Sequence, residues 1–184
     1  MKMFQNIQLA KRKMNKFNLS HEKKLSCKMG DLVPIYLEEV IPGDKFRVSS
    51  EIMMRLAPML APVMHRVNVY THYFFVANRL IHEDWEDFIT GGEDGQTVVN
   101  MPKLQISDTT AFYFQKGKLP DYFGIPITDG ITVAENSQIS ALPFRAYQLI
   151  YNEYYRDQNL SNPIDVPKDS INMTSTVMEQ NLLI

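Results

Sequence analysis

Residues 45–77 read KFRVSSEIMMRLAPMLAPVMHRVNVYTHYFFVA, and this stretch decides the fold expected for the chain. From 45 to 56, apolar side chains recur at nearly every second position, beginning with Phe46 and Val48. The alternation returns from 65 to 77, where β-branched and aromatic residues dominate. Successive side chains of a strand point to opposite faces, so each run predicts a strand with one buried face.

The residues between these two runs, 57–64, read APMLAPVM. Pro58 and Pro62 cannot donate a ladder hydrogen bond, so this stretch is expected to form a loop or a sheet edge. An apolar loop that contains Met59 and Met64 is unusual for a surface in water. We therefore expect both methionines to lie at an interface, either with a later part of the chain or with another subunit.

A further strand is expected over residues 32–41, which read LVPIYLEEVI. Pro42-Gly43-Asp44 follows and predicts a tight turn, because proline presets φ and glycine tolerates a positive φ. Residues 32–41 and 45–56 should then pair as a hairpin. No helix-length repeat lies among the three predicted strands, which favours an antiparallel sheet over alternating β-α units.

Helical patterns are confined to the later part of the chain. Residues 82–90 place Trp85 and Phe88 on one face, with acidic residues in the first turn and Gly91-Gly92 at the end. Residues 119–126 predict a short helical turn. The strongest pattern spans 143–157, where aromatic residues recur at helical spacing. Tyrosines combine apolar area with a polar tip, so we expect a packing or subunit interface here. Its residues are Tyr147, Tyr151, Tyr154 and Tyr155.

Composition and charge divide the chain into an arm and a body. The chain has 184 residues, enough for one domain with a core, and a single cysteine, Cys27, which excludes an internal disulfide framework. Residues 1–30 hold eight basic residues and one acidic residue, a net charge of +7, whereas the remainder holds 11 basic and 20 acidic residues, a net charge of −9. We expect a basic arm over 1–30 and one domain over 31–184, with a turn-rich insertion at about 91–140.

The basic arm predicts contact with nucleic acid, since a polyanion is the natural partner of clustered lysine and arginine. The alternative is a disordered solubilising tail. The candidate nucleic-acid contacts are Lys11, Arg12, Lys13, Lys16, Lys23 and Lys24. No apolar run reaches the length of a membrane span and no apolar leader segment is visible, so we expect no membrane partner and no secretory signal.

No residue pattern indicates catalysis, a metal or a cofactor. His65 and His72 are seven residues apart, so an unbroken strand would point them to opposite faces. His82 with its acidic neighbours is explained more simply as a helix start, and Cys27 with His21 lies in the arm without an oxyanion-stabilising turn. Neither a Walker pattern nor GxGxxG occurs. We expect a protein that is not an enzyme and holds no cofactor.

Three segments carry a family resemblance. They are FNLSHEKKLSCKMGDLVPIYLEEVIPGDKFRV at 17–48, LAPMLAPVMHRVNVYTHYFFVANRLIHEDWEDFITGG at 56–92 and ALPFRAYQLIYNEYYRDQNL at 141–160. In order and spacing, they resemble the N-terminal part of the major capsid protein of the Microviridae, in particular the gokushovirus branch of bacteriophages. The match is weaker over 93–140.

The resemblance implies a mainly β fold, a viral jelly roll built as an antiparallel β-sandwich with long insertions and short helices. It also implies a chain in which the jelly roll is incomplete, because family members are several-fold longer. The function implied is that of a structural protein of the virion. Copies would self-assemble into a small icosahedral shell around single-stranded DNA, together with other virion proteins, in the cytoplasm of a bacterial host.

Two other classes of function stay open from the residues alone. One is a non-viral DNA-binding module that acts through the basic arm and would bind DNA as a monomer with a steep salt dependence. The other is a jelly-roll enzyme or sugar-binding domain, which would need clustered carboxylates or histidines that the strand parity does not supply.

Overall fold

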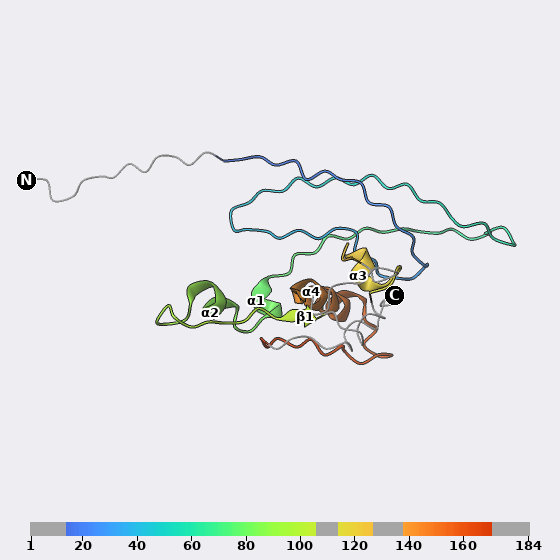
Figure 1. The fold of residues 1–184 in the computed structure, drawn as a ribbon. Helices are drawn as coiled ribbons and strands as arrows, with labels where there is room; N and C mark the ends of the chain where they lie inside the picture. Colours follow the sequence, from blue (N-terminus) through green and yellow to red (C-terminus); the bar gives the residue numbers. More distant parts are fainter. Residues whose placement is uncertain (1–13, 106–113, 127–137, 171–184) are drawn as a thin grey trace, which may run out of the picture.

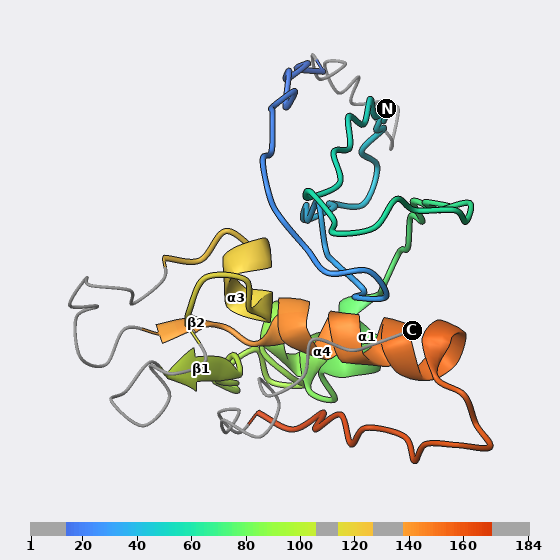
Figure 2. The same cartoon turned by 90° about the vertical axis from the view of Figure 1, so that its right-hand side faces the viewer.

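A computed structural model describes residues 14–105, 114–126 and 138–170. Its elements are α1 (Asn78–Ile81), α2 (Trp85–Thr90), β1 (Lys103–Gln105), α3 (Leu119–Tyr122), β2 (Gln138–Ser140), α4 (Leu142–Ile150) and the π-helix η2 (Tyr151–Tyr155). Figures 1 and 2 show two parts. A group of short helices surrounds α4, and the long extended segments of residues 14–77 lie to one side of it.

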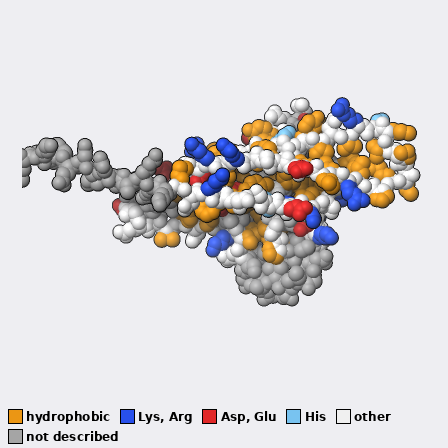
Figure 3. Space-filling model, turned by 90° about the horizontal axis from the view of Figure 1, so that it is seen from above, with side chains coloured by type: hydrophobic (Ala, Val, Ile, Leu, Met, Phe, Trp, Pro, Cys, Tyr) orange, Lys and Arg blue, Asp and Glu red, His pale blue; other side chains and the backbone are white. Residues whose placement is uncertain are grey.

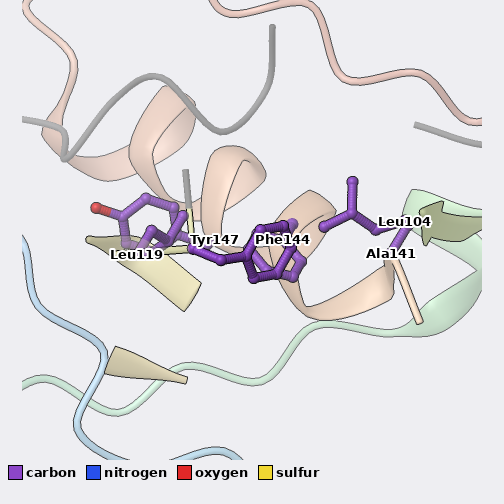
Figure 4. Close-up of a cluster of buried hydrophobic side chains, with 6 residues drawn as sticks. Leu104, Leu119, Ala141, Phe144 and Tyr147 are labelled. Carbon is purple, nitrogen blue, oxygen red and sulfur yellow. The ribbon is translucent and has the colours of Figure 1, made fainter. Parts of the chain in front are cut away.

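α4 organises the helical part because its apolar residues recur with the helical period and are buried on several sides. Phe144 and Tyr147 are buried in a core with Leu104, Phe114, Leu119 and Ala141 (Figure 4). Proline occupies its first turn, as the sequence predicted, and the helix continues directly into η2. The helix predicted over 143–157 is therefore confirmed, whereas its last turn is a π-helix that the periodicity did not indicate.

The other two helical predictions are also confirmed, with shifted bounds. α2 covers 85–90 of the predicted 82–90 and ends at Gly91, whose φ of 79° is left-handed. α3 covers 119–122 of the predicted 119–126. The sequence pattern did not predict α1, the four-residue helix that precedes α2.

The region expected to be an insertion contributes to the core. β1 and β2 pair antiparallel, with Lys103 opposite Ser140 and Leu104 opposite Ile139. Leu104, Phe114 and Leu119 all come from this region and supply much of the apolar core. The parts of the region around Leu104, Phe114 and Leu119 are thus packed into the helical part, whereas residues 93–98 are exposed. The domain boundaries at 30 and 31 stay predictions.

The three predicted strands are not strands in this structure. Residues 32–41, 45–56 and 65–77 have no helix or strand assignment, and most of their side chains are exposed. The predicted turn at Pro42-Gly43 is present, with the Asp44 amide donating to the Ile41 carbonyl at 3.1 Å and a φ of 97° at Gly43. A strand is stable only in a ladder with a buried face, and the described residues supply neither to these segments. The jelly roll stays a prediction.

Candidate assembly and nucleic-acid surfaces

A buried arginine joins the helices into one unit. The side chain of Arg145, in α4, is fully buried and donates to the carbonyl oxygens of Ile81 at 3.0 Å and Asp169 at 2.9 Å. An ion pair at 3.5 Å links Arg145 to the Asp169 carboxylate. Burial lowers the pKa of the Arg145 guanidinium, and the Asp169 carboxylate opposes this shift. α1, α4 and the segment around 169 are therefore held by a single side chain.

The same segment is fastened to the start of α2. The Glu83 amide donates to the Lys168 carbonyl at 2.8 Å, and the Ser170 hydroxyl donates to the Asp84 carboxylate at 2.6 Å. These bonds and the Arg145 contacts hold α1, α4, the start of α2 and residues 168–170 in fixed positions relative to one another. Arg145 was not among the predicted site residues, although polar residues at 145 and 148 within an apolar helical pattern indicate a buried polar network.

An aromatic cluster joins the extended segments to the end of α4. The ring of Phe74 lies 4.9 Å from the ring of Tyr154, between centroids, and 6.0 Å from that of Tyr155. His72 stacks on Tyr155 at 5.8 Å, and its Nδ1 shares a hydrogen bond with the Tyr155 hydroxyl. Burial raises the pKa of Tyr155. An open groove of about 500 Å³ lies among these residues, and it also contacts Thr71 and Tyr73.

The four predicted interface tyrosines lie at different depths. Tyr147 is buried in the core and donates its hydroxyl hydrogen to the Leu32 carbonyl at 2.8 Å, and Tyr151 packs against the same core. Tyr155 is half-buried in the aromatic cluster, whereas Tyr154 is 70 % exposed. Of the four, Tyr154 thus offers the largest free surface to another molecule.

Apolar side chains are exposed along the extended segments. Met64 is 84 % exposed, and Met59 and Val48 are each about half exposed. Figure 3 views the molecule from the side of these segments and shows hydrophobic side chains gathered over them, with charged groups scattered between. The extended segments 45–56 and 65–77 contact each other through Ser50 and Tyr73, whose hydroxyl oxygens are 3.1 Å apart. A surface of this composition is typical of an interface with its partner removed.

The predicted nucleic-acid contacts fall into three groups. Lys11, Arg12 and Lys13 lie outside the described residues. Lys16 is exposed, and Lys24 forms a surface ion pair with Glu22 at 3.7 Å. Lys23 differs from both, because its ammonium donates to the carbonyl oxygens of Tyr122 and Pro34. Burial lowers the pKa of Lys23, and the nearby Asp121 carboxylate opposes this shift.

Tyr122 is a second residue that the sequence analysis missed. Its buried side chain in α3 donates to the Ser26 carbonyl at 3.0 Å, across 96 positions of the chain. Burial raises the pKa of Tyr122, and the neighbouring Cys27, Asp31 and Asp121 add to the shift. A single sequence carries no signal for this contact, because the acceptor is a backbone oxygen.

The described residues contain neither a candidate metal site nor a candidate membrane-spanning helix. Over 14–105, 114–126 and 138–170, no three His, Cys, Asp or Glu side chains come together as metal ligands. Across the same residues, no helix has the length and apolar character needed to cross a membrane.

Comparison with known proteins gives a consistent result. The family model described as capsid protein (F protein) matches residues 5–184. The chain is 40 % identical to capsid protein VP1 of Bdellovibrio phage phiMH2K over 154 residues, which is 84 % of this chain and 28 % of that protein. It is 36 % identical to capsid protein VP1 of Chlamydia phage 1 over 171 residues, which is 89 % of this chain and 27 % of that protein.

A third curated relative gives the same result. The chain is 31 % identical to capsid protein VP1 of Spiroplasma virus 4 over 159 residues, which is 86 % of this chain and 28 % of that protein. The chain therefore spans a little over a quarter of the length of the curated relatives that it matches.

Proposed function

We propose a structural role in a phage shell for this chain, which belongs to the capsid protein (F protein) family. Membership of this family confirms the capsid resemblance that the order and spacing of the three segments indicated. Because the chain spans only part of its relatives' length, the proposal concerns what this segment contributes to a longer protein.

The observation that carries the proposal is the exposure of two alternating apolar faces. Residues 45–56 and 65–77 have the side-chain pattern of strands, yet their apolar positions are open to water. Soluble proteins rarely expose apolar surface of this extent unless a partner covers it. We infer that both segments pair with further strands from the length of the relatives that this chain does not span, completing an antiparallel jelly roll.

The exposed apolar residues that lie outside these two segments would then form contacts between copies of the protein. A closed icosahedral shell needs several different self-contacts on each subunit. The apolar loop with Met59 and Met64 and the free face of Tyr154 supply apolar surface away from the core. These are the residues that we assign to contacts between subunits.

We assign single-stranded DNA as the second partner, through the basic arm. Lys16 and Lys24 are exposed in the described part of the arm, and Lys11, Arg12 and Lys13 extend the same run of charge. Such charges would neutralise phosphates on the inside of the shell. The proposed role requires no catalytic step and places the protein in the virion, assembled in a bacterial cytoplasm, with other virion proteins as neighbours.

The test is to express the full-length protein that contains this chain and to image it by negative-stain electron microscopy after nuclease treatment. Uniform small icosahedral shells support the proposal. DNA extracted from them should be sensitive to a nuclease specific for single strands. A soluble monomer that binds DNA but never assembles would contradict the proposal and favour the DNA-binding module instead.

A further inference from the structure

Two buried tyrosines hold a segment at the junction of the arm and the body that contains no helix or strand. This segment, residues 23–34, is here named the strap. Tyr122 of α3 donates to the Ser26 carbonyl at 3.0 Å, and Tyr147 of α4 donates to the Leu32 carbonyl at 2.8 Å. The side chain of Leu32 packs against the apolar core. The strap is therefore fixed at two points by donors that are themselves held in the core.

Lys23 closes the strap at its first residue. Its ammonium donates to the Tyr122 carbonyl and lies 3.4 Å from the Pro34 carbonyl, so it joins the strap's two ends and α3. Lys24, the next residue, has a different environment. It pairs with Glu22 at 3.7 Å, and both side chains are at least 80 % exposed.

We propose that Lys23, Tyr122 and Tyr147 form a latch that fixes the strap to the helical part, and that Lys23 is a positioning residue rather than a nucleic-acid contact. All three donors bond to backbone oxygens, which are strong acceptors that must find partners when taken from water. The latch thereby sets where the arm leaves the body. Lys24 stays at the surface, where it can bind a polyanion. Only this role of Lys24 rests on the proposed function.

Limited proteolysis of the full chain tests the latch. Trypsin requires several residues of released backbone, so cleavage after Lys28 should report opening of the strap. Tyr122→Phe, Tyr147→Phe and Lys23→Met each remove one donor and keep the rest of the side chain's bulk. A hydrogen bond of ordinary strength corresponds to an equilibrium change of about five-fold, so each variant should speed cleavage by roughly that factor. Lys24→Met is the matched control and should match the wild type within about two-fold.

The outcomes separate the parts of the proposal. Wild-type cleavage rates in both tyrosine variants would overturn the latch. Faster cleavage in these variants but not in Lys23→Met would overturn the assignment of Lys23. Equal acceleration by Lys24→Met would show a general effect of charge and would also overturn it.

A salt titration of single-stranded DNA binding supplies a second readout. We expect Lys24→Met to lower the slope of log K against log salt by about one and Lys23→Met to leave it unchanged. A loss of slope in Lys23→Met equal to that in Lys24→Met would place Lys23 among the DNA contacts. If the wild-type chain does not bind DNA, the assignment of DNA as a partner of the arm fails, whereas the proteolysis still decides the latch.

Discussion

Replacing Arg145 with methionine should destabilise the helical part of this protein more than any change of a surface charge. The guanidinium is fully buried and donates to two carbonyl oxygens, those of Ile81 and Asp169, at 3.0 and 2.9 Å. Methionine has a similar stem and no donor, so Arg145→Met removes these bonds and the ion pair to Asp169 while it fills most of the space.

The magnitude follows from the bonds and from what they leave behind. A hydrogen bond that involves a charged group contributes about 1.5–3 kcal/mol, so two such bonds contribute roughly 3–6 kcal/mol. The Asp169 side chain is 49 % exposed, so water can solvate its charge once the arginine is gone. We therefore expect a loss at the lower end, about 3 kcal/mol. In a chain of this size, that is a fall in Tm of roughly 6–12 °C.

Thermal unfolding should be followed by the fluorescence of Trp85. Trp85 is the only tryptophan of the chain and stacks on Phe88 with 5.6 Å between ring centroids, so it reports on α2, whose start is fastened to the segment around Asp169 that Arg145 holds. Arg79→Met, an exposed arginine of α1, is the matched control and should change stability by less than about 0.5 kcal/mol. A Tm for Arg145→Met within about 1 °C of the wild type, or an equal fall in Arg79→Met, would refute the reasoning.

Four further changes test other parts of the structure. His82 is fully buried, and its ring nitrogens have no hydrogen-bond partner among the described residues. His82→Leu should therefore raise the free energy of unfolding in urea by about 1 kcal/mol. A clear loss of stability would instead reveal a partner for the ring. Gly91→Ala should lower the free energy of unfolding by at least about 2 kcal/mol in the same assay, because φ is +79° and the new Cβ would lie 2.9 Å from the Gly95 backbone. An unchanged urea midpoint would contradict this. Tyr122 has a raised pKa in the folded state, so its contribution to stability is complete below about pH 10 and is lost as pH rises through that raised value. Tyr122→Phe should therefore reduce the alkaline loss of Tm, and an unaltered profile would argue against it. Tyr154→Ala should cost the chain only about 1 kcal/mol in thermal unfolding but lower the yield of shells in electron micrographs; normal shells would remove it from the interface.

The helices could be predicted because their signals are local. The period of Phe144 and Tyr147 identifies α4, and the glycine at 91 marks the end of α2 at the residue where the structure ends it. These signals depend on residues within a few positions of one another. The π-helical last turn could not be predicted, since the same tyrosine spacing suits an α-helix.

The extended segments show the limit of a periodic pattern. The alternation over 45–56 and 65–77 identifies which side chains share a face, but a ladder also needs a partner strand. Within the described residues no such partner is present, so the segments are extended and exposed. A period therefore predicts the orientation of side chains more securely than it predicts hydrogen bonding.

The long-range hydrogen bonds of the candidate site could not be predicted from the sequence, for a different reason. Arg145 bonds to a carbonyl 64 positions away, and Tyr122 bonds to one 96 positions away. Any residue can supply a backbone oxygen, so the acceptors leave no trace in the amino-acid types. Lys23 and Lys24 accordingly look equivalent in sequence, whereas the structure places one against the body and the other in solvent.

Hydrogen–deuterium exchange measured on the chain alone and within assembled shells tests the central claim most directly. The claim is that residues 45–56 and 65–77 acquire strand partners from the rest of the longer protein, which the assembled shells contain. It predicts fast amide exchange in both segments of the isolated chain and strong protection of the same amides in the shell, because ladder hydrogen bonds slow exchange. Equally fast exchange in both states would contradict the account, since the exposed apolar faces would then remain unpartnered in the assembled particle.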